Sequence, residues 1–144
     1  MAVTYTQNWK FIANALRNKL RLEFGSVLAV YIGEGDYAGN HFLKILPQSN
    51  TVVERYAKGE LRQYNFQLIY YFMDANIREV GLKQMLRVLC RIESLLGNFR
   101  SLNITDTTKI TNGQLTDYEI VEGEDGFEYL TEMNYSCLHL GNLE

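Results

Sequence analysis

Hydrophobic residues recur at helical spacing in two stretches of the chain, and the first of these is residues 5–23. Its apolar positions lie three or four residues apart, and they are Trp9, Ile12, Ala13, Leu16 and Leu20. Because such positions share one side of a helix, the pattern predicts an amphipathic α-helix. Thr4 with Gln7 forms a candidate capping box at its start, and Gly25 offers a stop at its end.

The second stretch is residues 77–96, which we expect to form the longer helix. Leu82, Met85, Leu86, Leu89, Ile92 and Leu96 form its main apolar face, and Val80, Val88 and Leu95 extend that face. A helix with so narrow a polar side is expected to be largely enclosed. Asn76 and Glu79 form a second candidate capping box, and Gly97 with Asn98 ends the pattern.

Strands are predicted between the two helices. Residues 27–32 are a continuous apolar run, which is typical of a strand buried on both faces. A second strand is expected from His41 to Leu46, ending at Pro47, and Thr51–Tyr56 is either another strand or an extension of it. In residues 61–73 aromatic and aliphatic side chains alternate with mostly polar ones, which predicts a strand with one face on the core.

The C-terminal part of the chain predicts antiparallel β structure. Asn112-Gly113 is a strong two-residue turn signal, so we expect a hairpin there. Gly123–Gly126 predicts another turn, and Phe127–Leu140 predicts a long final strand. Together with the helices, these elements predict an α+β fold: an antiparallel or mixed β-sheet packed against two α-helices, with a C-terminal β-meander.

Length and composition fit a single domain spanning residues 1–144. The sequence is 47% hydrophobic and 22% charged, and it contains neither an internal repeat nor a linker-like tract. No apolar run approaches the roughly 18 residues that span a bilayer, so we expect no membrane partner. Cys90 and Cys137 are expected to be buried free thiols in a reducing cytosol, with a disulfide or a redox role as the alternatives.

Charge is divided unevenly along the chain. Residues 1–100 contain 13 basic and 8 acidic side chains, whereas residues 101–144 contain 1 basic and 9 acidic side chains. The net charge of −3 does not favour nucleic-acid binding, which usually needs a basic domain. A basic part and an acidic part can attract copies of the chain head to tail, and uneven solvation without any partner is the alternative.

The motifs that could carry catalysis do not fit the chemistry they would need. Gly33, Gly35 and Gly39 lie between two predicted strands, so they lack the helix N-terminus that would hold a phosphate. Cys137 and His139 lie on the same face of one strand about 7 Å apart, which is too far for a nucleophile and its base. We therefore predict no catalytic residues, no metal site, no cofactor and no enzymatic activity.

Three groups of polar residues are candidate contact surfaces instead. The first is a basic ridge on the predicted helices, the second is an acidic surface along the C-terminal strands, and the third is an acidic, glycine-rich loop. The basic residues are Lys83, Arg87, Arg91, Arg17 and Arg21; the acidic residues are Asp117, Glu119, Glu122, Glu128 and Glu132; the loop residues are Glu34, Asp36 and Tyr37. For the first two groups, ordinary solvated faces of a helix and a strand are the alternative interpretation.

The order and texture of the elements resemble those of bacteriophage tail terminator and tail-completion (neck) proteins. An N-terminal helix leads into a buried strand and an acidic glycine loop. The aromatic strand Arg62–Phe72 then runs directly into a long helix, and a hairpin closes on Glu128–Tyr135. The resemblance covers residues 5–140 and rests on element order rather than on a diagnostic motif.

The resemblance implies a structural virion protein that forms a ring, hexameric in such proteins, which caps the tail tube and joins it to the neck or head. The implied partners are other copies of the chain, the tail tube protein and neck or head-completion proteins, with the sheath as a further candidate. DNA would only pass through the lumen, beside Glu34, Asp36 and Tyr37. The implied location is the virion tail or neck, after synthesis in the host bacterial cytoplasm.

Sequence alone leaves other assignments open. A neck head-closure adaptor, or another tail or baseplate assembly protein, would carry the same features. A small ligand-binding domain or enzyme is a more distant alternative. Unlike surfaces on one chain favour the ring, because heterologous contacts close into rings when the rotation between copies permits it.

Overall fold

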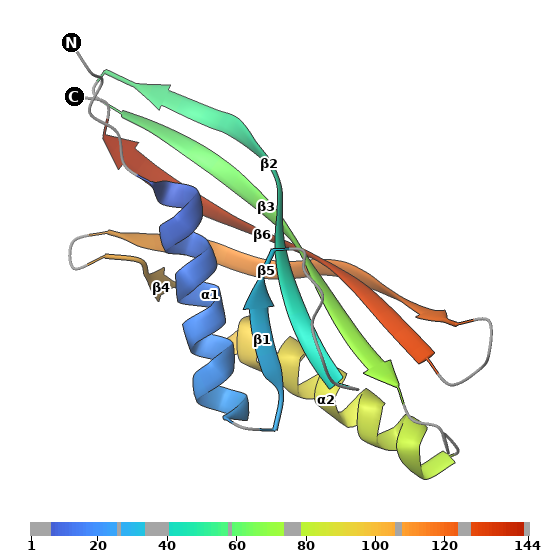
Figure 1. Cartoon of the computed structure of the whole chain (residues 1–144). Coiled ribbons are helices and arrows are strands. Elements are labelled where there is room, and N and C mark those ends of the chain that lie inside the picture. Colours follow the sequence, from blue (N-terminus) through green and yellow to red (C-terminus); the bar gives the residue numbers. More distant parts are fainter. Residues whose placement is uncertain are drawn as a thin grey trace.

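The computed structural model describes residues 7–25, 27–33, 41–57, 59–73, 79–105, 108–123 and 128–142. Its elements in chain order are α1 (Asn8–Phe24), β1 (Ala29–Ile32), β2 (His41–Tyr56), β3 (Gly59–Met73), α2 (Glu79–Asn98), β4 (Leu102–Asn103), β5 (Lys109–Glu122) and β6 (Glu128–Asn142). The predicted α+β class, with a mixed sheet and two helices, is confirmed (Figure 1).

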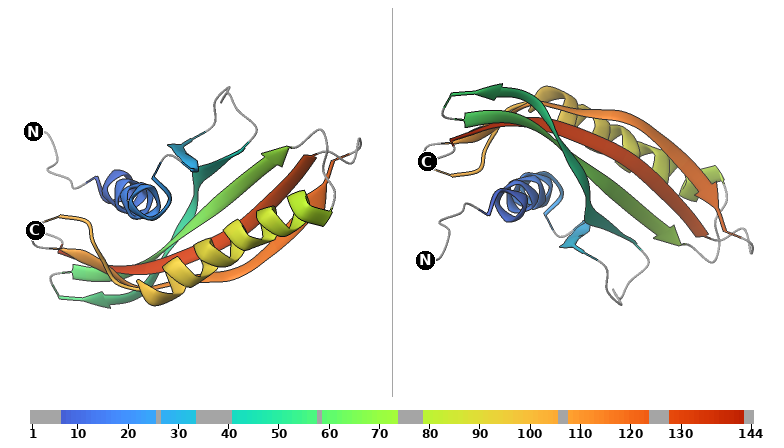
Figure 2. Two further views of the ribbon diagram at one scale, coloured as in Figure 1. Left: turned by 90° about the horizontal axis from the view of Figure 1, so that it is seen from below. Right: turned by 90° about the horizontal axis from the view of Figure 1, so that it is seen from above.

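The described strands form one six-stranded sheet in the order β1-β2-β3-β6-β5-β4. Strand β1 runs parallel to β2, and the other described neighbours are antiparallel. The last three strands are neighbours, as a meander requires, but β4 pairs with β5 at only two positions. The sheet is strongly curved; α1 lies in its hollow, and α2 runs along β6 and β5 (Figure 2).

The core lies between the helices and one face of this sheet. Leu16 and Leu20 of α1 and Ile92 of α2 are completely buried, and they belong to one apolar cluster with alternate residues of β3 and β6. In β3 the buried aromatic and aliphatic residues are Tyr64, Phe66, Leu68, Tyr70 and Phe72, as the period-two pattern predicts. The opposite sheet face carries no described helix, so we call it the open face.

The first helix begins later than the sequence pattern predicts, and residues 77 and 78, the predicted start of the second, lie outside the described residues. Helix α1 starts at Asn8, and its N-cap residue Gln7 makes no side-chain capping bond within the described residues. Thr4 and Asn76, which belong to the two predicted capping boxes, lie outside the described residues. The predicted stop at Gly25 is confirmed: Gly25 has φ 57°, and its N–H donates to the carbonyl of Arg21.

The first two strands differ from their prediction. Strand β1 is not buried on both faces, since Ala29 is exposed and Val30 is buried. The prediction that the next strand ends at Pro47 is wrong, because β2 continues through this residue to Tyr56. Proline lacks an N–H, but Pro47 lies beyond the four residues that pair with β1, so no described strand on the outer side needs that donor.

The predicted hairpin at Asn112-Gly113 is also wrong. Strand β5 runs straight through these residues, with a shift of register against β6 between Thr111 and Gln114. Asn112 takes the left-handed conformation at φ 53°, which in this sequence forms a bulge rather than a turn. The Gly113 N–H donates to the carbonyl of Arg100 at 2.8 Å, so a contact distant in the chain holds this conformation.

Helix α2 is less enclosed than its composition predicts. Met85, Leu89 and Ile92 are buried, but Leu86 is 39% exposed. Cys90 is exposed, so the prediction of two buried thiols holds only for Cys137. These exposed positions lie on the side of α2 toward β5, where the hydroxyl of Tyr118 donates to Glu93 at 3.4 Å.

Candidate functional site

The acidic candidate surface follows β5 and β6. Glu119 pairs in register with Glu132, and both side chains are exposed on the open face. Like charges directly opposite each other on neighbouring strands destabilise a sheet, and no described cation pairs with either carboxylate to offset that cost. A cationic partner would remove that cost.

The other acidic residues have different surroundings. Asp117 accepts hydrogen bonds from Asn134 Nδ2 at 3.1 Å and from the hydroxyl of Thr116 at 3.0 Å. Glu128 accepts one from the Tyr71 hydroxyl at 3.2 Å. Glu122 is exposed at the end of β5. The structure therefore brings all five predicted acidic residues to one pair of strands, with Glu119 and Glu132 as its least satisfied members.

The basic candidate residues are brought together less completely. Arg91 Nη2 forms an ion pair with Glu23 Oε1 at 3.0 Å and also donates to the Glu23 backbone carbonyl at 3.2 Å. Its guanidinium lies 4.6 Å from the centroid of the Phe24 ring. These contacts cross from α2 to the end of α1 and hold the two helices together. Arg91 is therefore already partnered within the chain.

The two arginines of α1 are also restricted by the fold, Arg21 by a hydrogen bond and Arg17 by burial. Arg21 Nη2 donates to the carbonyl of Val30 at 2.8 Å, which ties α1 to β1. The Nε atom of Arg17 is buried without a hydrogen-bond partner in the described part of the chain. Lys83 and Arg87 are exposed on α2. Arg87 is the exposed arginine of this group that has neither an ion pair nor a hydrogen bond among the described residues.

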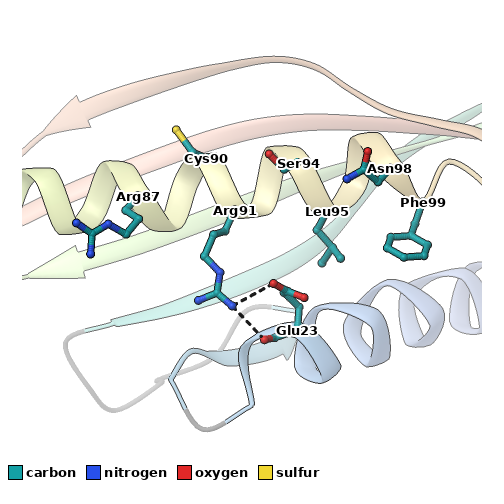
Figure 3. A pocket seen from close by; sticks show the side chains of 8 residues that line it. All are labelled: Glu23, Arg87, Cys90, Arg91, Ser94, Leu95, Asn98 and Phe99. Atoms are coloured by element: carbon teal, nitrogen blue, oxygen red, sulfur yellow. Dashed lines mark hydrogen bonds and ion pairs between the residues drawn. The ribbon is translucent and has the colours of Figure 1, made fainter.

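A pocket of about 360 Å³ lies where α2 meets the end of α1, lined by Glu23, Arg87, Cys90, Arg91, Ser94, Leu95, Asn98 and Phe99. Figure 3 shows the Arg91–Glu23 pair crossing it, while the Cys90 side chain points the opposite way. The ion pair neutralises the charges of Arg91 and Glu23, which leaves Arg87 as the charged lining residue without an ion pair among the described residues. The pocket is therefore a gap between two packed helices, α1 and α2, which the Arg91–Glu23 ion pair bridges.

The candidate nucleophile does not have the surroundings that chemistry requires. Burial raises the pKa of the Cys137 thiol to about 12, so it is a neutral thiol at physiological pH. Burial lowers the pKa of His139, whose side chain is only 4% exposed. Within the described residues no group of three or more His, Cys, Asp or Glu side chains is arranged to hold a metal ion.

Two further expectations concern the predicted lumen loop and membrane-spanning helices. Glu34, Asp36 and Tyr37, the predicted lumen residues, lie outside the described residues, so their role stays a prediction. Among the described helices, none is both long and apolar enough to cross a membrane.

Two exposed strand segments were not singled out by the sequence patterns. In β5, Tyr118, Ile120 and Val121 are 38%, 39% and 42% exposed, and in β2 Val53 and Tyr56 are 52% and 50% exposed. The sequence of the first segment does contain a signal for such a surface. Its apolar residues lie on both faces of the strand, and three acidic residues lie between or beside them. Its significance depends on which strands lie at the sheet edges, and only the topology reveals that.

Comparison with known proteins gives a structural likeness only. No protein-family model matches the chain, and no curated protein matches it in sequence. One similar solved structure is a chain of the virion of a native gene transfer agent (GTA) particle, with a TM-score of 0.68 and 12% identity, covering 95% of this chain and 100% of that chain. A second, whose title names no function, has a TM-score of 0.65 and 9% identity, covering 96% and 99%. The chain therefore shares its fold with a chain of the gene transfer agent virion.

Proposed function

We propose that this chain is a structural virion protein of a tailed phage or a phage-like particle. The observation that carries the proposal is the fold shared with the gene transfer agent virion chain, which extends over 95% of this chain and all of that one. A likeness of this extent involves the whole architecture. It also agrees with the resemblance to phage proteins that the order of helices and strands in the sequence indicates.

Within this class, the proposed role is that of a tail terminator. Copies form a homo-oligomeric ring, a hexamer in the first instance, which caps the tail tube and joins it to the neck or head. DNA passes only through the lumen. The support is the division of charge between two regions of one chain, because unlike surfaces make head-to-tail contacts, which close into a ring when the rotation between copies permits it.

The geometry narrows the residues proposed for this contact. On the acidic side the strongest candidates are Glu119 and Glu132, because their mutual repulsion is relieved by a cation. On the basic side the strongest candidate is Arg87, which is exposed on α2, whereas Arg91 and Arg21 have partners inside the chain. The proposed contact therefore sets the β5–β6 carboxylates of one copy against a basic side chain of the next, with Arg87 as one candidate.

Light scattering on the purified chain, followed by negative-stain electron microscopy, tests the ring. We expect a species several times larger than the 16.7 kDa monomer, with a central hole. Arg87→Glu should shift the population toward monomer, and Lys10→Glu, an equal charge change at an exposed α1 position outside the ridge, should not. A wild-type chain that stays monomeric at every concentration contradicts the proposed ring.

The terminator role is distinguished from that of a neck adaptor by its effect on tube growth. Tail tube protein from the same source is allowed to polymerise with and without this chain, and tube lengths are measured by electron microscopy. A terminator caps the end and shortens the distribution as its concentration rises. Tubes of unchanged length, together with binding to head-completion proteins, would favour the adaptor instead.

A further inference from the structure

The sheet has two edge segments that no described strand covers. On one side, β4 pairs only with Lys109 and Ile110 of β5, and the last outer contact along β5 is the bond from Gly113 to Arg100. On the other side, β1 pairs with Phe42–Ile45 of β2, and Gly33 adds a bond to Ile45. Beyond these points, the outer backbone groups of β5 and β2 face no strand within the described residues.

The exposed part of β5 is a regular strand. From Asp117 to Glu122 it pairs with β6 without a shift of register. All six residues are exposed, and they include Tyr118, Ile120 and Val121. Natural edge strands are usually blunted by lysine, proline or bulges, because an uncovered regular strand recruits another one. Within this stretch the only such protection is negative charge.

That negative charge determines which partner is excluded. Two β5 segments placed side by side would bring together Asp117, Glu119 and Glu122 from each copy, and opposed like charges disfavour such pairing. A symmetrical β5–β5 contact is therefore selected against. The partner strand has to be neutral or basic along its edge.

The outer half of β2 meets this requirement in net charge, because Glu54 and Arg55 offset each other along Ser49–Tyr56. From Pro47 to Tyr56 its side chains are exposed on both faces, except for the half-buried Val52. Val53 has no β3 partner because of a register shift. The Arg55 side chain is 75% exposed, and its Nε atom lies 3.9 Å from Glu60 Oε2 in a long ion pair. Pro47 has no N–H to donate, so a partner strand can pair from Ser49 onward.

We propose that the β5 segment Asp117–Glu122 of one copy adds to the β2 segment Ser49–Tyr56 of the next, which makes the sheet continuous between subunits. The proposal rests on the ring assembly proposed above and identifies the backbone contact that builds it. The pairing satisfies outer N–H and C=O groups on both edges and buries Val53 against the apolar residues of β5. It also brings Arg55 to the acidic strand. The two edges are different, so the contact is heterologous, which is the type of contact that closes into a ring when the rotation between copies permits it.

Hydrogen exchange on the full-length chain gives the first test. Amides that pair across the contact exchange slowly once copies assemble. We expect residues 117–122 and 49–56 to gain protection in the assembled fraction relative to a dilute monomer. Large species in which neither segment gains protection would overturn the edge pairing and leave the ring itself intact.

Cross-linking with a short bismaleimide gives the second test. Val53→Cys and Val121→Cys are each made in a Cys90→Ser background, which removes the exposed native thiol and keeps the buried Cys137. A mixture of the two variants should give dimers that contain one of each, and neither variant alone should cross-link efficiently. Leu22→Cys, at an α1 position that is 82% exposed, replaces Val121→Cys in the control mixture, which should stay uncross-linked.

The alternative outcomes separate the two proposals. Dimers of Val121→Cys alone would indicate symmetrical β5 pairing, and dimers of Val53→Cys alone would indicate symmetrical β2 pairing; either overturns the inference. Protection of residues 117–122 only when another virion protein is added would assign the edge to that protein and also overturn it. A chain that never assembles contradicts the ring, and the edge pairing falls with it.

Discussion

Glu119 on β5 and Glu132 on β6 lie directly opposite each other in the antiparallel ladder, and both are exposed on the open face of the sheet. In the row across the sheet, the next residue toward β2 is Ile69, followed by Lys44. An isoleucine therefore separates the pair from the lysine on that face. The arrangement costs stability in the isolated chain, which is expected of a surface that serves a partner rather than the fold.

Glu132→Gln is predicted to stabilise the monomer. Removing one of two opposed carboxylates should raise the free energy of unfolding by about 0.2–1 kcal/mol, as measured by urea denaturation at low salt. The same change should weaken assembly. Asp117→Asn is the matched control, because it removes a carboxylate that accepts bonds from Asn134 and Thr116 and should not be stabilising. A loss of stability in Glu132→Gln would contradict the repulsion.

Arg91→Ala is predicted to loosen the contact between α1 and α2. The lost ion pair with Glu23 and the lost stacking over Phe24 together should lower the free energy of unfolding by about 1 kcal/mol. Arg87→Ala is the control, because it lines the same pocket without an ion pair among the described residues. A double-mutant cycle with Glu23→Gln isolates the pairwise energy. A coupling energy of zero would mean that solvent screens the pair completely.

The parts of the fold that were predicted correctly depend on local patterns. The alternation along residues 61–73 identifies β3 and its buried face, and Gly25 marks the end of α1, because strand pleating and helix termination involve neighbouring residues only. The errors arise where distant residues decide. Asn112-Gly113 is a bulge because Arg100 accepts from Gly113. Pro47 is tolerated because it lies at a sheet edge.

The sequence predicts which residues make up the candidate surfaces. It does not predict which of these residues already have partners within the chain. The acidic residues lie together because β5 and β6 form one hairpin, which follows from their closeness in sequence. The basic residues are different. Arg91 and Glu23 are 68 positions apart, so nothing local indicates that this arginine is already paired. The open edges of β2 and β5 follow from the strand order, which the sequence pattern does not determine.

His139 is predicted to make stability depend on pH. Its pKa in the folded chain is below the unfolded value of 6.5, because burial disfavours the charged imidazolium. The unfolded chain therefore binds the proton more readily, so the stabilisation is fully present above pH 6.5 and is lost as the pH falls. Urea unfolding at about pH 8 and about pH 5.5 should show the loss, since histidines titrate between these values.

His139→Phe is predicted to reduce this dependence. The phenyl ring is close in size, and Nε2 of His139 has no hydrogen-bond partner among the described residues to be lost. A residual dependence of the same sign should remain, because burial also lowers the pKa of His41. If the variant and the wild type lose equal stability on acidification, the acid sensitivity arises elsewhere in the chain.

Gly113→Ala is predicted to destabilise the chain by about 1–3 kcal/mol, which is the usual cost of overpacking. A Cβ at this position would collide with the Tyr135 hydroxyl and lie 3.1 Å from the Arg100 carbonyl oxygen. Gly97→Ala is the control, because a Cβ there meets nothing within 4 Å and alanine favours the helix, so this variant should be stabilised by about 0.5–1 kcal/mol.

The double variant Gly113→Ala/Tyr135→Phe tests the physical reason for that cost. Removing the hydroxyl opens the space that the new methyl group occupies, and the buried hydroxyl has no hydrogen-bond partner among the described residues, so its removal costs little. Chemical denaturation should therefore show part of the lost stability restored. No restoration would assign the cost to the approach of the Arg100 carbonyl, and to the bulge that this carbonyl holds, rather than to the tyrosine.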